Sequence, residues 1–351
     1  MPNSAKVYPV SADVENLFLL PSASCLLLNN QSMPLNPAFQ TFLQQCEQLQ
    51  LPPLVSLTPT EARSRNARLW RKALRPRPIF NIVDRTIPGP AAAIPVRIYT
   101  PETNKALPLL VYFHGGGWVL GNLDSMDGLC RTLAGDAHCI VVSVDYRLAP
   151  EHKFPAAVED VYAATTWVAS HASALNGDPT RLAVGGDSAG GNLAAAVTLL
   201  ARDRGNLALC WQLLIYPSLQ YGAETESYQQ YGDGQFGLSQ EEMTWFWQHY
   251  LNHPTEGQNP LASPLLAPDL SGLPPAHIIT AEYDILRDEA EAYAIRLKQA
   301  GIPVQLQRYD GAIHTFIELS SKVEVSRRAI ADITHRLQQT FGLCHSTTRI
   351  D

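Results

Sequence analysis

The sequence predicts an α/β fold in which a mainly parallel central sheet is flanked by helices. Short apolar runs typical of buried strands alternate with stretches rich in helix-forming residues, a pattern that favours a doubly wound parallel sheet. The chain also has 351 residues, of which 46 % are hydrophobic, so it is able to bury a substantial core. We therefore expect one large core domain that carries additional helices.

Five segments are expected along the chain. They are 1–75, an N-terminal extension with cap helices; 76–217, the first part of the core; 218–262, a second cap segment; 263–342, the second part of the core; and 343–351, a tail. In the first segment, residues 36–49 and residues 59 to about 74 are predicted to be helical. Residues 17–28 resemble a short signal core, but acidic residues precede them, so we expect an ordered or fraying extension.

Three consecutive glycines follow a predicted strand at residues 109–113. They belong to the motif His114-Gly115-Gly116-Gly117-Trp118. Because each glycine costs conformational entropy on ordering, the triplet indicates a positive φ or a close approach of backbone N–H groups to a ligand. In acyl transfer that ligand is an oxyanion, and we assign Gly116, Gly117 and the N–H of Ala189 to binding it. The alternative is a turn beside a nucleotide, but the chain lacks both common glycine-rich nucleotide motifs.

The stretch Tyr146-Arg-Leu-Ala-Pro-Glu151 follows a predicted strand at residues 140–144. It offers no nucleophile, and its proline ends regular structure. Arg147 and Glu151 are expected to pair locally. We interpret this stretch as scaffold.

The motif Gly186-Asp-Ser-Ala-Gly190 matches G-x-S-x-G, the pattern of a nucleophile elbow. In such an elbow a sharp strand-to-helix turn holds the serine Oγ clear of the sheet, and the flanking glycines relieve the crowding. A lone match is often only a glycine-rich turn. Here residues 181–185 are predicted to form a strand and residues 192–202 a helix, which favours Ser188 as a nucleophile.

An acid and a histidine should follow the elbow, each in a loop after a strand. Residues 276–281 are predicted to form a strand, and the carboxylates of Glu282, Asp284 and Asp288 come after it. Asp288 begins a predicted helix, where acids are favoured by the helix dipole and by capping. Glu282 lies too close to the end of the strand for its side chain to reach outward. We therefore select Asp284 as the acid.

His314 is the candidate base. It follows a predicted strand at residues 304–309 and precedes a predicted terminal helix. His335 lies within that helix and His345 in the polar tail. Among the ten histidines, order and placement select His314.

Residues 239–250 are predicted to form a helix in the second cap segment. Ser239 is the expected N-cap, and the glutamate three positions later completes the pattern of a capping box. The aromatic face of this helix comprises Met243, Trp245, Phe246 and Trp247. This face either lines an acyl pocket or packs in the core, and the sequence leaves both open. The candidate substrate-binding side chains are Trp118, Met243 and Phe246.

Four motifs together resemble those of the hormone-sensitive-lipase-like esterases, also called bacterial family IV esterases, which have the α/β-hydrolase fold. They are His114-Gly-Gly-Gly-Trp118, Tyr146-Arg-Leu-Ala-Pro-Glu151 with Phe154-Pro-Ala-Ala157, Gly186-Asp-Ser-Ala-Gly190 and Asp284-x-Leu-x-Asp288, within roughly residues 35–340. The resemblance implies that Ser188, Asp284 and His314 form a catalytic triad and that residues 115–117 build an oxyanion hole.

Two positions depart from the family pattern. Ile285 stands where the family often has proline, and Thr315 follows the histidine where glycine is common. Neither change removes a reacting atom. Both alter the loops that carry the acid and the base.

Charge and composition exclude several function classes. A net charge of −7 with no lysine-arginine cluster argues against nucleic-acid binding and anionic membrane surfaces, and no run reaches 18 apolar residues, so stable membrane insertion is not expected. The six cysteines show no C-x-x-C spacing, and no histidine cluster offers metal ligands. We expect no metal, no cofactor, free thiols and a cytoplasmic location.

The sequence therefore predicts a metal-free serine carboxylesterase that works through an acyl-enzyme. The resemblance implies short- or medium-chain esters as the small-molecule substrates and makes a homodimer possible. One alternative is a non-catalytic small-molecule receptor, because plant gibberellin receptors resemble this family but lack the catalytic histidine. The other alternative is a deacetylase or amidase with a narrow metabolite substrate.

Overall fold

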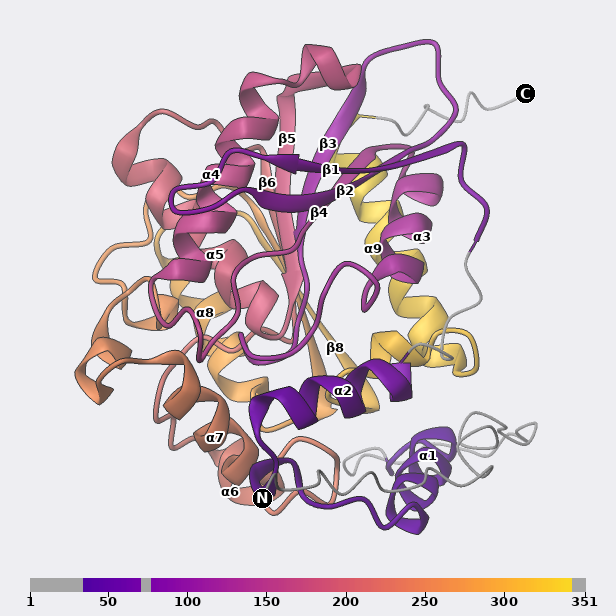
Figure 1. The fold of residues 1–351 in the computed structure, drawn as a ribbon, viewed down its shortest axis with the longest axis vertical. Coiled ribbons are helices and arrows are strands. Elements are labelled where there is room, and N and C mark those ends of the chain that lie inside the picture. Colours follow the sequence, from indigo (N-terminus) through magenta and orange to yellow (C-terminus); the bar gives the residue numbers. More distant parts are fainter. Residues whose placement is uncertain (1–33, 71–76, 343–351) are drawn as a thin grey trace, which may run out of the picture.

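A single sheet of eight strands organises the protein (Figure 1), whose computed structural model describes residues 34–70 and 77–342. The strands are β1 (Asn81–Ile87), β2 (Ile94–Thr100), β3 (Leu107–Phe113), β4 (Ile140–Val144), β5 (Gly177–Asp187), β6 (Trp211–Ile215), β7 (Ala276–Tyr283) and β8 (Val304–Ile313). Their order is β1-β2-β4-β3-β5-β6-β7-β8. β2 is antiparallel to both of its neighbours, and every pairing from β4 to β8 is parallel. The predicted fold class is confirmed.

The central strands are apolar because both faces of the sheet are covered. Every residue of β3, β4 and β6 is buried. Along β3 the side chains alternate: Val111 and Phe113 belong to one hydrophobic cluster, and Leu110 and Tyr112 belong to the other. All five strands expected from the apolar runs are confirmed, within a few residues at their ends.

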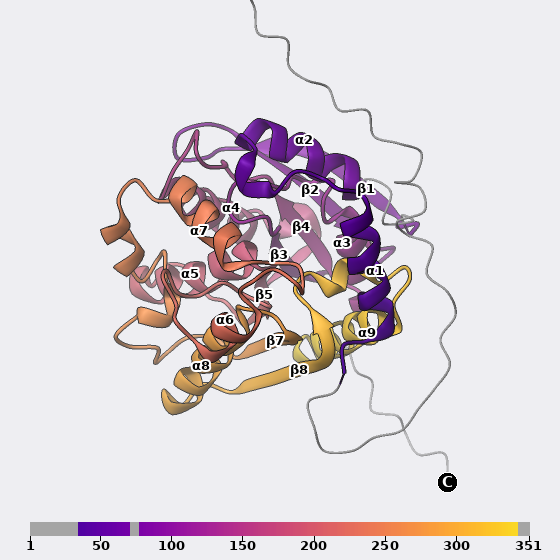
Figure 2. The ribbon, with the colours of Figure 1, turned by 90° about the horizontal axis from the view of Figure 1, so that it is seen from below.

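Helices form a layer on each face of the sheet (Figures 1 and 2). The helices that contact the sheet are α3 (Asp127–Ala137), α4 (Ala156–Ser170), α5 (Ala189–Arg204), α8 (Arg287–Gln299) and α9 (Glu324–Thr340). α4, α5 and α8 contribute buried residues to one cluster, and α3 and α9 to the other. The helix predicted at residues 192–202 corresponds to α5, and the helix predicted to begin at Asp288 corresponds to α8.

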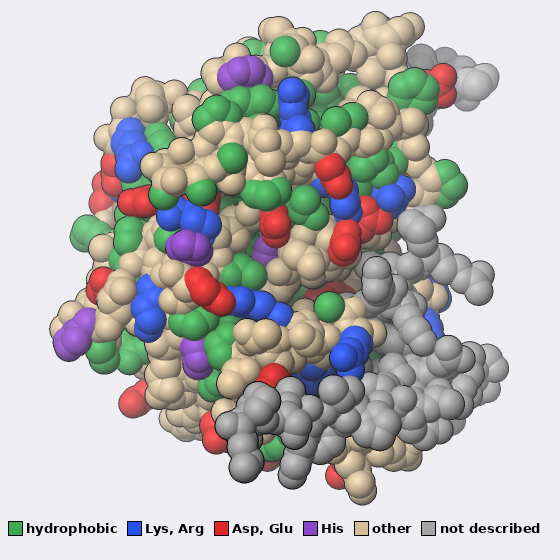
Figure 3. Space-filling model, viewed as in Figure 1, with side chains coloured by type: hydrophobic (Ala, Val, Ile, Leu, Met, Phe, Trp, Pro, Cys, Tyr) green, Lys and Arg blue, Asp and Glu red, His purple; other side chains and the backbone are tan. Residues whose placement is uncertain are grey.

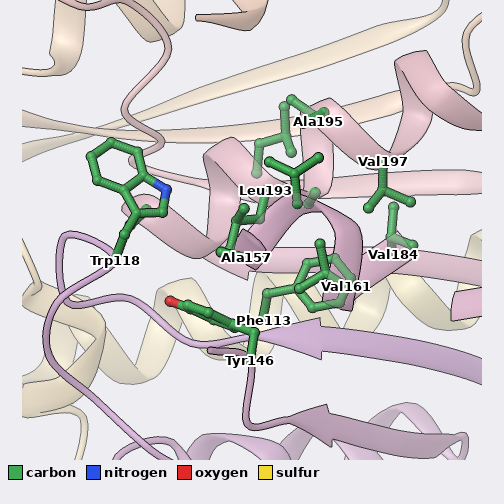
Figure 4. Packing of buried hydrophobic residues seen from close by; sticks show 14 of the residues in the cluster. Phe113, Trp118, Tyr146, Ala157, Val161, Val184, Leu193, Ala195 and Val197 are labelled. Atoms are coloured by element: carbon green, nitrogen blue, oxygen red, sulfur yellow. The ribbon is translucent and has the colours of Figure 1, made fainter. Parts of the chain in front are cut away.

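The helix α5 starts directly after Ser188 and is held in place by close packing in the core. Figure 4 shows Leu193 and Val197 of α5 near Val161 of α4 and Val184 of β5, and all of these side chains belong to the same hydrophobic cluster. Burial of a side chain of this size contributes about 1.5–3 kcal/mol. The base of the site is therefore a rigid part of the core.

Four further helices gather beyond the carboxyl ends of the strands, as Figure 2 shows from that side. They are α1 (Pro37–Gln48), α2 (Pro59–Trp70), α6 (Glu226–Tyr231) and α7 (Gln240–Tyr250). In α7 the predicted capping box is confirmed, because Ser239 Oγ accepts from the N–H of Glu242 at 3.0 Å and the Glu242 carboxylate accepts from the N–H of Ser239 at 3.1 Å. The first two helices belong to the N-terminal cap segment and the last two to the second, whose bounds remain a prediction.

The surface charges, the helix lengths and the cysteines of the described residues can be compared with the expectations from the sequence. Basic and acidic side chains are intermixed on the face shown in Figure 3. Within the described ranges, no helix has the length and apolar character needed to cross a membrane, and Cys46, Cys130, Cys139 and Cys210 are free thiols. The predicted extension at residues 17–28, the tail, Cys25 and Cys344 lie outside the described residues.

The predicted local pair between Arg147 and Glu151 is wrong. Arg147 instead binds Asp160 of α4, with its Nε and Nη2 each 2.8 Å from a carboxylate oxygen. Glu151 accepts two hydrogen bonds from Arg63 of α2, at 2.6 and 2.7 Å. The planar guanidinium groups each find a carboxylate that they bind with two nitrogens, a geometry that the neighbouring Arg147 and Glu151 do not form with each other. This stretch therefore joins a cap helix to the core.

Arg63 connects α2 to the core through hydrogen bonds to backbone carbonyls as well as through its ion pair. Its Nε donates to the carbonyl of Val119 at 2.8 Å and its Nη2 to the carbonyl of Ala149 at 2.7 Å, besides the two bonds to Glu151. Val119 follows the glycine triplet, so α2 is attached next to the candidate site.

We expect Arg63→Ala to lower the free energy of unfolding by about 1–3 kcal/mol, because four charge-assisted hydrogen bonds are lost together. Urea unfolding measures this change. The control is Arg327→Ala, which removes an exposed pair with Glu324 inside α9 and should change stability by less than about 0.5 kcal/mol. Equal effects of the two substitutions would contradict the docking role of Arg63.

Candidate active site

Ser188 stands at a strained turn between β5 and α5. Its backbone has φ 52° and ψ −118°, a conformation that costs a residue other than glycine about 1–3 kcal/mol. The flanking glycines make the turn possible, since a Cβ on Gly190 would overlap the carbonyl oxygen of Phe113 and a Cβ on Gly186 would overlap Gly190. The N–H of Ser188 donates to the carbonyl of Ile215 at 2.8 Å. The local geometry is that of a nucleophile elbow.

The three residues selected from the sequence lie in one hydrogen-bonded series. His314 Nε2 is 3.1 Å from Ser188 Oγ, and His314 Nδ1 is 2.7 Å from Asp284 Oδ2. The other carboxylate oxygen of Asp284 accepts from the N–H of Leu286 at 2.9 Å. Asp284 and His314 are buried, so their contacts are shielded from water. This order of groups is suited to removing a proton from the serine hydroxyl.

The two rejected carboxylates have structural partners. Asp288 accepts from the N–H of Ser227 at 2.7 Å and pairs with Arg287 at 2.8 Å. Glu282 accepts from the N–H of Gly311 at 2.7 Å, in the strand that leads to the histidine. Neither has a hydrogen bond to His314 among the described residues.

The glycine triplet forms a loop beside Ser188. Gly116 and Gly117 have φ values of 114° and 58°, in the region that favours glycine. The N–H of Gly115 donates to Asp187 at 3.1 Å. Among the hydrogen bonds of the described residues, none uses the N–H of Gly116, Gly117 or Ala189. Of the four predicted oxyanion donors, Gly115 thus lies in the loop but directs its N–H to a carboxylate.

Asp187 holds this loop, a function that the sequence reasoning missed. Its Oδ1 accepts from Tyr112 Oη at 2.8 Å as well as from Gly115. Burial raises the pKa of Asp187 to about 6, although these hydrogen bonds and the nearby His314 act in the opposite direction. The only signal in the sequence was its place inside the G-x-S-x-G motif.

A cavity of about 290 Å³ opens over Ser188. The glycine triplet, Ala189, His314 and side chains of α1, α2 and α7 line it. On α7, Met243 and Phe246 face this cavity and Trp247 instead packs against Trp118, with ring centroids 4.3 Å apart. Trp118 lines the cavity too, but its ring is stacked on Tyr250 and is fully buried. The aromatic face of α7 therefore divides between the pocket and the core.

Phe246 fits against the glycine loop. A Cβ on Gly117 would overlap the Phe246 ring, so the loop and the cap helix are in direct contact. Phe42, Leu43 and Cys46 of α1 line another part of the cavity. Sequence reasoning missed these three residues, because the helical pattern of α1 gives no indication of which core loops it will cover.

His114 supports the loop as a neutral ring. Burial lowers its pKa to about 4, its Nδ1 is 2.8 Å from the carbonyl oxygen of Gly115, and its ring is stacked on Tyr146. Tyr146 Oη donates to the carbonyl of His114 at 2.8 Å. Within the described ranges, no group of three or more metal-ligating side chains could hold a metal ion.

The chain is similar to a known family and to several known proteins. A family model described as alpha/beta hydrolase fold matches residues 110–318. The chain is 49 % identical to the carboxylic ester hydrolase LipN of Mycobacterium tuberculosis over 68 % of this chain and 65 % of that protein. It is 39 % identical to an arylesterase of Saccharolobus solfataricus over 81 % of this chain and 93 % of that protein.

Solved structures show the same similarity. A hyperthermophilic esterase from the archaeon Pyrobaculum calidifontis is 42 % identical to this chain, and the two structures superpose with a TM-score of 0.83. The match covers 88 % of this chain and 99 % of the other. The match to the family model extends over more than half of the chain, and the fold, the motifs and these relatives agree. The chain therefore belongs to the α/β-hydrolase family, among the hormone-sensitive-lipase-like (bacterial family IV) esterases.

Proposed function

We propose that this chain is a serine carboxylesterase that hydrolyses short- to medium-chain carboxylic esters through an acyl-enzyme on Ser188. The observation that carries the proposal is the series from Ser188 through His314 to Asp284 at the floor of the cavity. Relatives named as ester hydrolases support the same reaction class.

The first half of the reaction forms the acyl-enzyme. His314 Nε2 accepts the proton of Ser188 Oγ as the oxygen attacks the ester carbonyl carbon, and Asp284 stabilises the imidazolium. The carbonyl oxygen becomes an oxyanion, to which the N–H groups of Gly116, Gly117 and Ala189 donate. Each such donor contributes about 2.7–4 kcal/mol to stabilising the transition state. His314 then gives its proton to the leaving alcohol as the carbon–oxygen bond breaks.

The second half restores the serine. His314 takes a proton from water, whose oxygen attacks the acyl carbon, and then returns a proton to Ser188 Oγ as the acid leaves. Both halves use the same base and the same oxyanion donors. No other reactant is required.

The cavity suits short and medium acyl chains. Its volume of about 290 Å³ is at the lower end of the range for small-molecule sites. The side chains of Met243 and Phe246 provide apolar contacts, which favour an aliphatic group. A receptor role is disfavoured, because His314 is present and hydrogen-bonded to both partners. The cytoplasmic location, a homodimer and the absence of nucleic-acid binding remain predictions from the sequence.

Ser188→Ala should lower kcat for p-nitrophenyl butyrate by on the order of 10⁴-fold or more, because the variant has no nucleophile. The measurement is hydrolysis of p-nitrophenyl esters from acetate to palmitate by both proteins. We expect the parent protein to be most active on short or medium chains. Turnover that persists in the variant would rule out the acyl-enzyme on Ser188.

Asp284→Asn should lower kcat by on the order of 10⁴-fold, because the amide favours the wrong histidine tautomer. Asp288→Asn is the matched control: the same change is made four positions later, in a carboxylate bound to Ser227 and Arg287. It should lower thermal stability and leave kcat within a few-fold of the parent. If Asp288→Asn lost as much activity as Asp284→Asn, the assignment of the acid would fail.

Phe246→Leu should shift the preference towards longer acyl chains, because the smaller side chain enlarges the cavity beside Gly117. We expect the ratio of kcat/KM for decanoate to that for butyrate to rise roughly tenfold. Thr244→Ala is the control, since this exposed hydroxyl on the same helix only donates to the carbonyl of Gln240. An unchanged ratio in Phe246→Leu would exclude this ring from the acyl pocket.

A further inference from the structure

We propose that Glu318 gives the alcohol side of the cavity a preference for esters whose alcohol part carries a free hydroxyl group. The inference rests on the proposed function, because it names the substrate class of the same site. Glu318 lies in the short 3₁₀ helix η6 (Phe316–Leu319), directly after His314, and its side chain lines the cavity.

The mechanism determines which side of the cavity receives the alcohol. His314 Nε2 must reach the leaving oxygen, so the alcohol lies on the side of His314 and of the residues that follow it. The oxyanion points to the glycine loop, and the acyl chain leaves the carbonyl carbon in the remaining direction. Thr315 and Glu318 line the cavity and follow His314 along the chain, so we assign them to the alcohol side.

Among the described residues, three carboxyl groups line the cavity, and Glu318 differs from the other two. Asp187 is bound by Tyr112 and Gly115, and Glu242 completes the capping box with Ser239. In the part of the chain that the structure describes, no hydrogen bond or ion pair engages the Glu318 carboxyl, and no lysine or arginine lines the cavity. An apolar alcohol would therefore remove water from this carboxyl without replacing its hydrogen bonds, which is unfavourable.

The backbone before Glu318 is strained. Thr315 has φ 61°, in the left-handed region that a β-branched residue rarely adopts. Its carbonyl accepts from the N–H of Glu318 at 3.0 Å, so this turn sets the direction of the short helix. Glycine would take the same conformation without strain, yet the chain keeps a side chain that lines the cavity. Strain of this kind is found where a residue has a functional use.

The protonation state of Glu318 favours a hydroxyl over a cation. Burial and the neighbouring Asp187 carboxyl raise the pKa of Glu318 well above its ordinary value, which favours the neutral form of this carboxyl group. A neutral carboxyl group both donates and accepts hydrogen bonds, as a hydroxyl does. An ammonium group gains less from a neutral carboxyl group than from a carboxylate, whereas a hydroxyl group can form a hydrogen bond with either form.

The test compares hydroxyethyl butyrate with propyl butyrate, which have equal numbers of non-hydrogen atoms and share one acyl group. Butyric acid release at neutral pH gives kcat/KM for each ester. We expect the parent protein to prefer hydroxyethyl butyrate by on the order of tenfold, which is the effect of one hydrogen bond in a shielded site. A parent protein without this preference overturns the proposal before any variant is made.

Two variants then assign the preference to Glu318. Glu318→Leu keeps an apolar side chain of similar length, and the ratio should fall to about one. Glu318→Gln both donates and accepts hydrogen bonds and should keep most of the preference. The matched control, Glu324→Leu, changes a largely exposed glutamate of α9 outside the cavity and should keep the parent ratio. A preference that survives in Glu318→Leu overturns the proposal.

Failure of the proposal about Glu318 can be distinguished from failure of the proposed esterase function. Hydrolysis of p-nitrophenyl butyrate, which has no such hydroxyl, reports whether each variant is folded and competent. If Ser188→Ala remained active, the proposed esterase mechanism would fail. If Ser188→Ala is inactive but the ester ratio is unaffected by Glu318→Leu, only the inference about Glu318 fails.

Discussion

The left-handed backbone of Ser188 is the constraint on which the rest of the site depends. It is held by the hydrogen bond to Ile215 and by the close approach of Gly190 to the backbone of Phe113. That approach requires β3 and β5 to be neighbours, as they are in the sheet. The loop that follows β3 then lies beside the serine, as the role proposed for Gly116 and Gly117 in binding an oxyanion requires.

Asp187 fixes the position of the glycine loop relative to Ser188. It precedes Ser188 on β5, and its carboxylate binds both Tyr112 of β3 and Gly115 of the loop. One side chain therefore links the strand before the proposed nucleophile to the loop that contains the proposed oxyanion donors. Because a displacement of about 1 Å at a catalytic group can cost roughly a hundredfold in rate, such a link has a direct chemical purpose.

Much of the site could be predicted from the sequence, because its signals are local. Ser188, Asp284 and His314 each follow the last residue of a strand, and the carboxyl ends of parallel strands meet at one edge of a sheet. The glycines were recognisable because a positive φ or a close backbone approach leaves few other choices. Order along the chain then sufficed to select one histidine from ten.

The contacts that could not be predicted from the sequence are those between segments far apart along the chain. Arg63 and Glu151 are 88 positions apart, and nothing local distinguishes Arg63 from the other arginines of α2. The same holds for Phe42 and Cys46, whose position over the cavity depends on how α1 crosses the core. Arg147 was given the wrong partner because a neighbour in sequence was available, whereas Asp160 is reached only once α4 has folded back.

The segment that carries the acid also holds the second cap segment. Asp288 binds the first turn of α6 through Ser227, and the buried Glu289 accepts from the N–H groups of Leu219 and Gln220 at 2.5 and 3.3 Å. Burial raises the pKa of Glu289 to about 8, while these two N–H groups favour its charged form. Asp284 is only a few residues away on the same turn. A displacement of this cap segment would therefore act on the segment that contains Asp284, the proposed acid. The shape of the cavity and the alignment of the proposed triad thus depend on the same short stretch of chain.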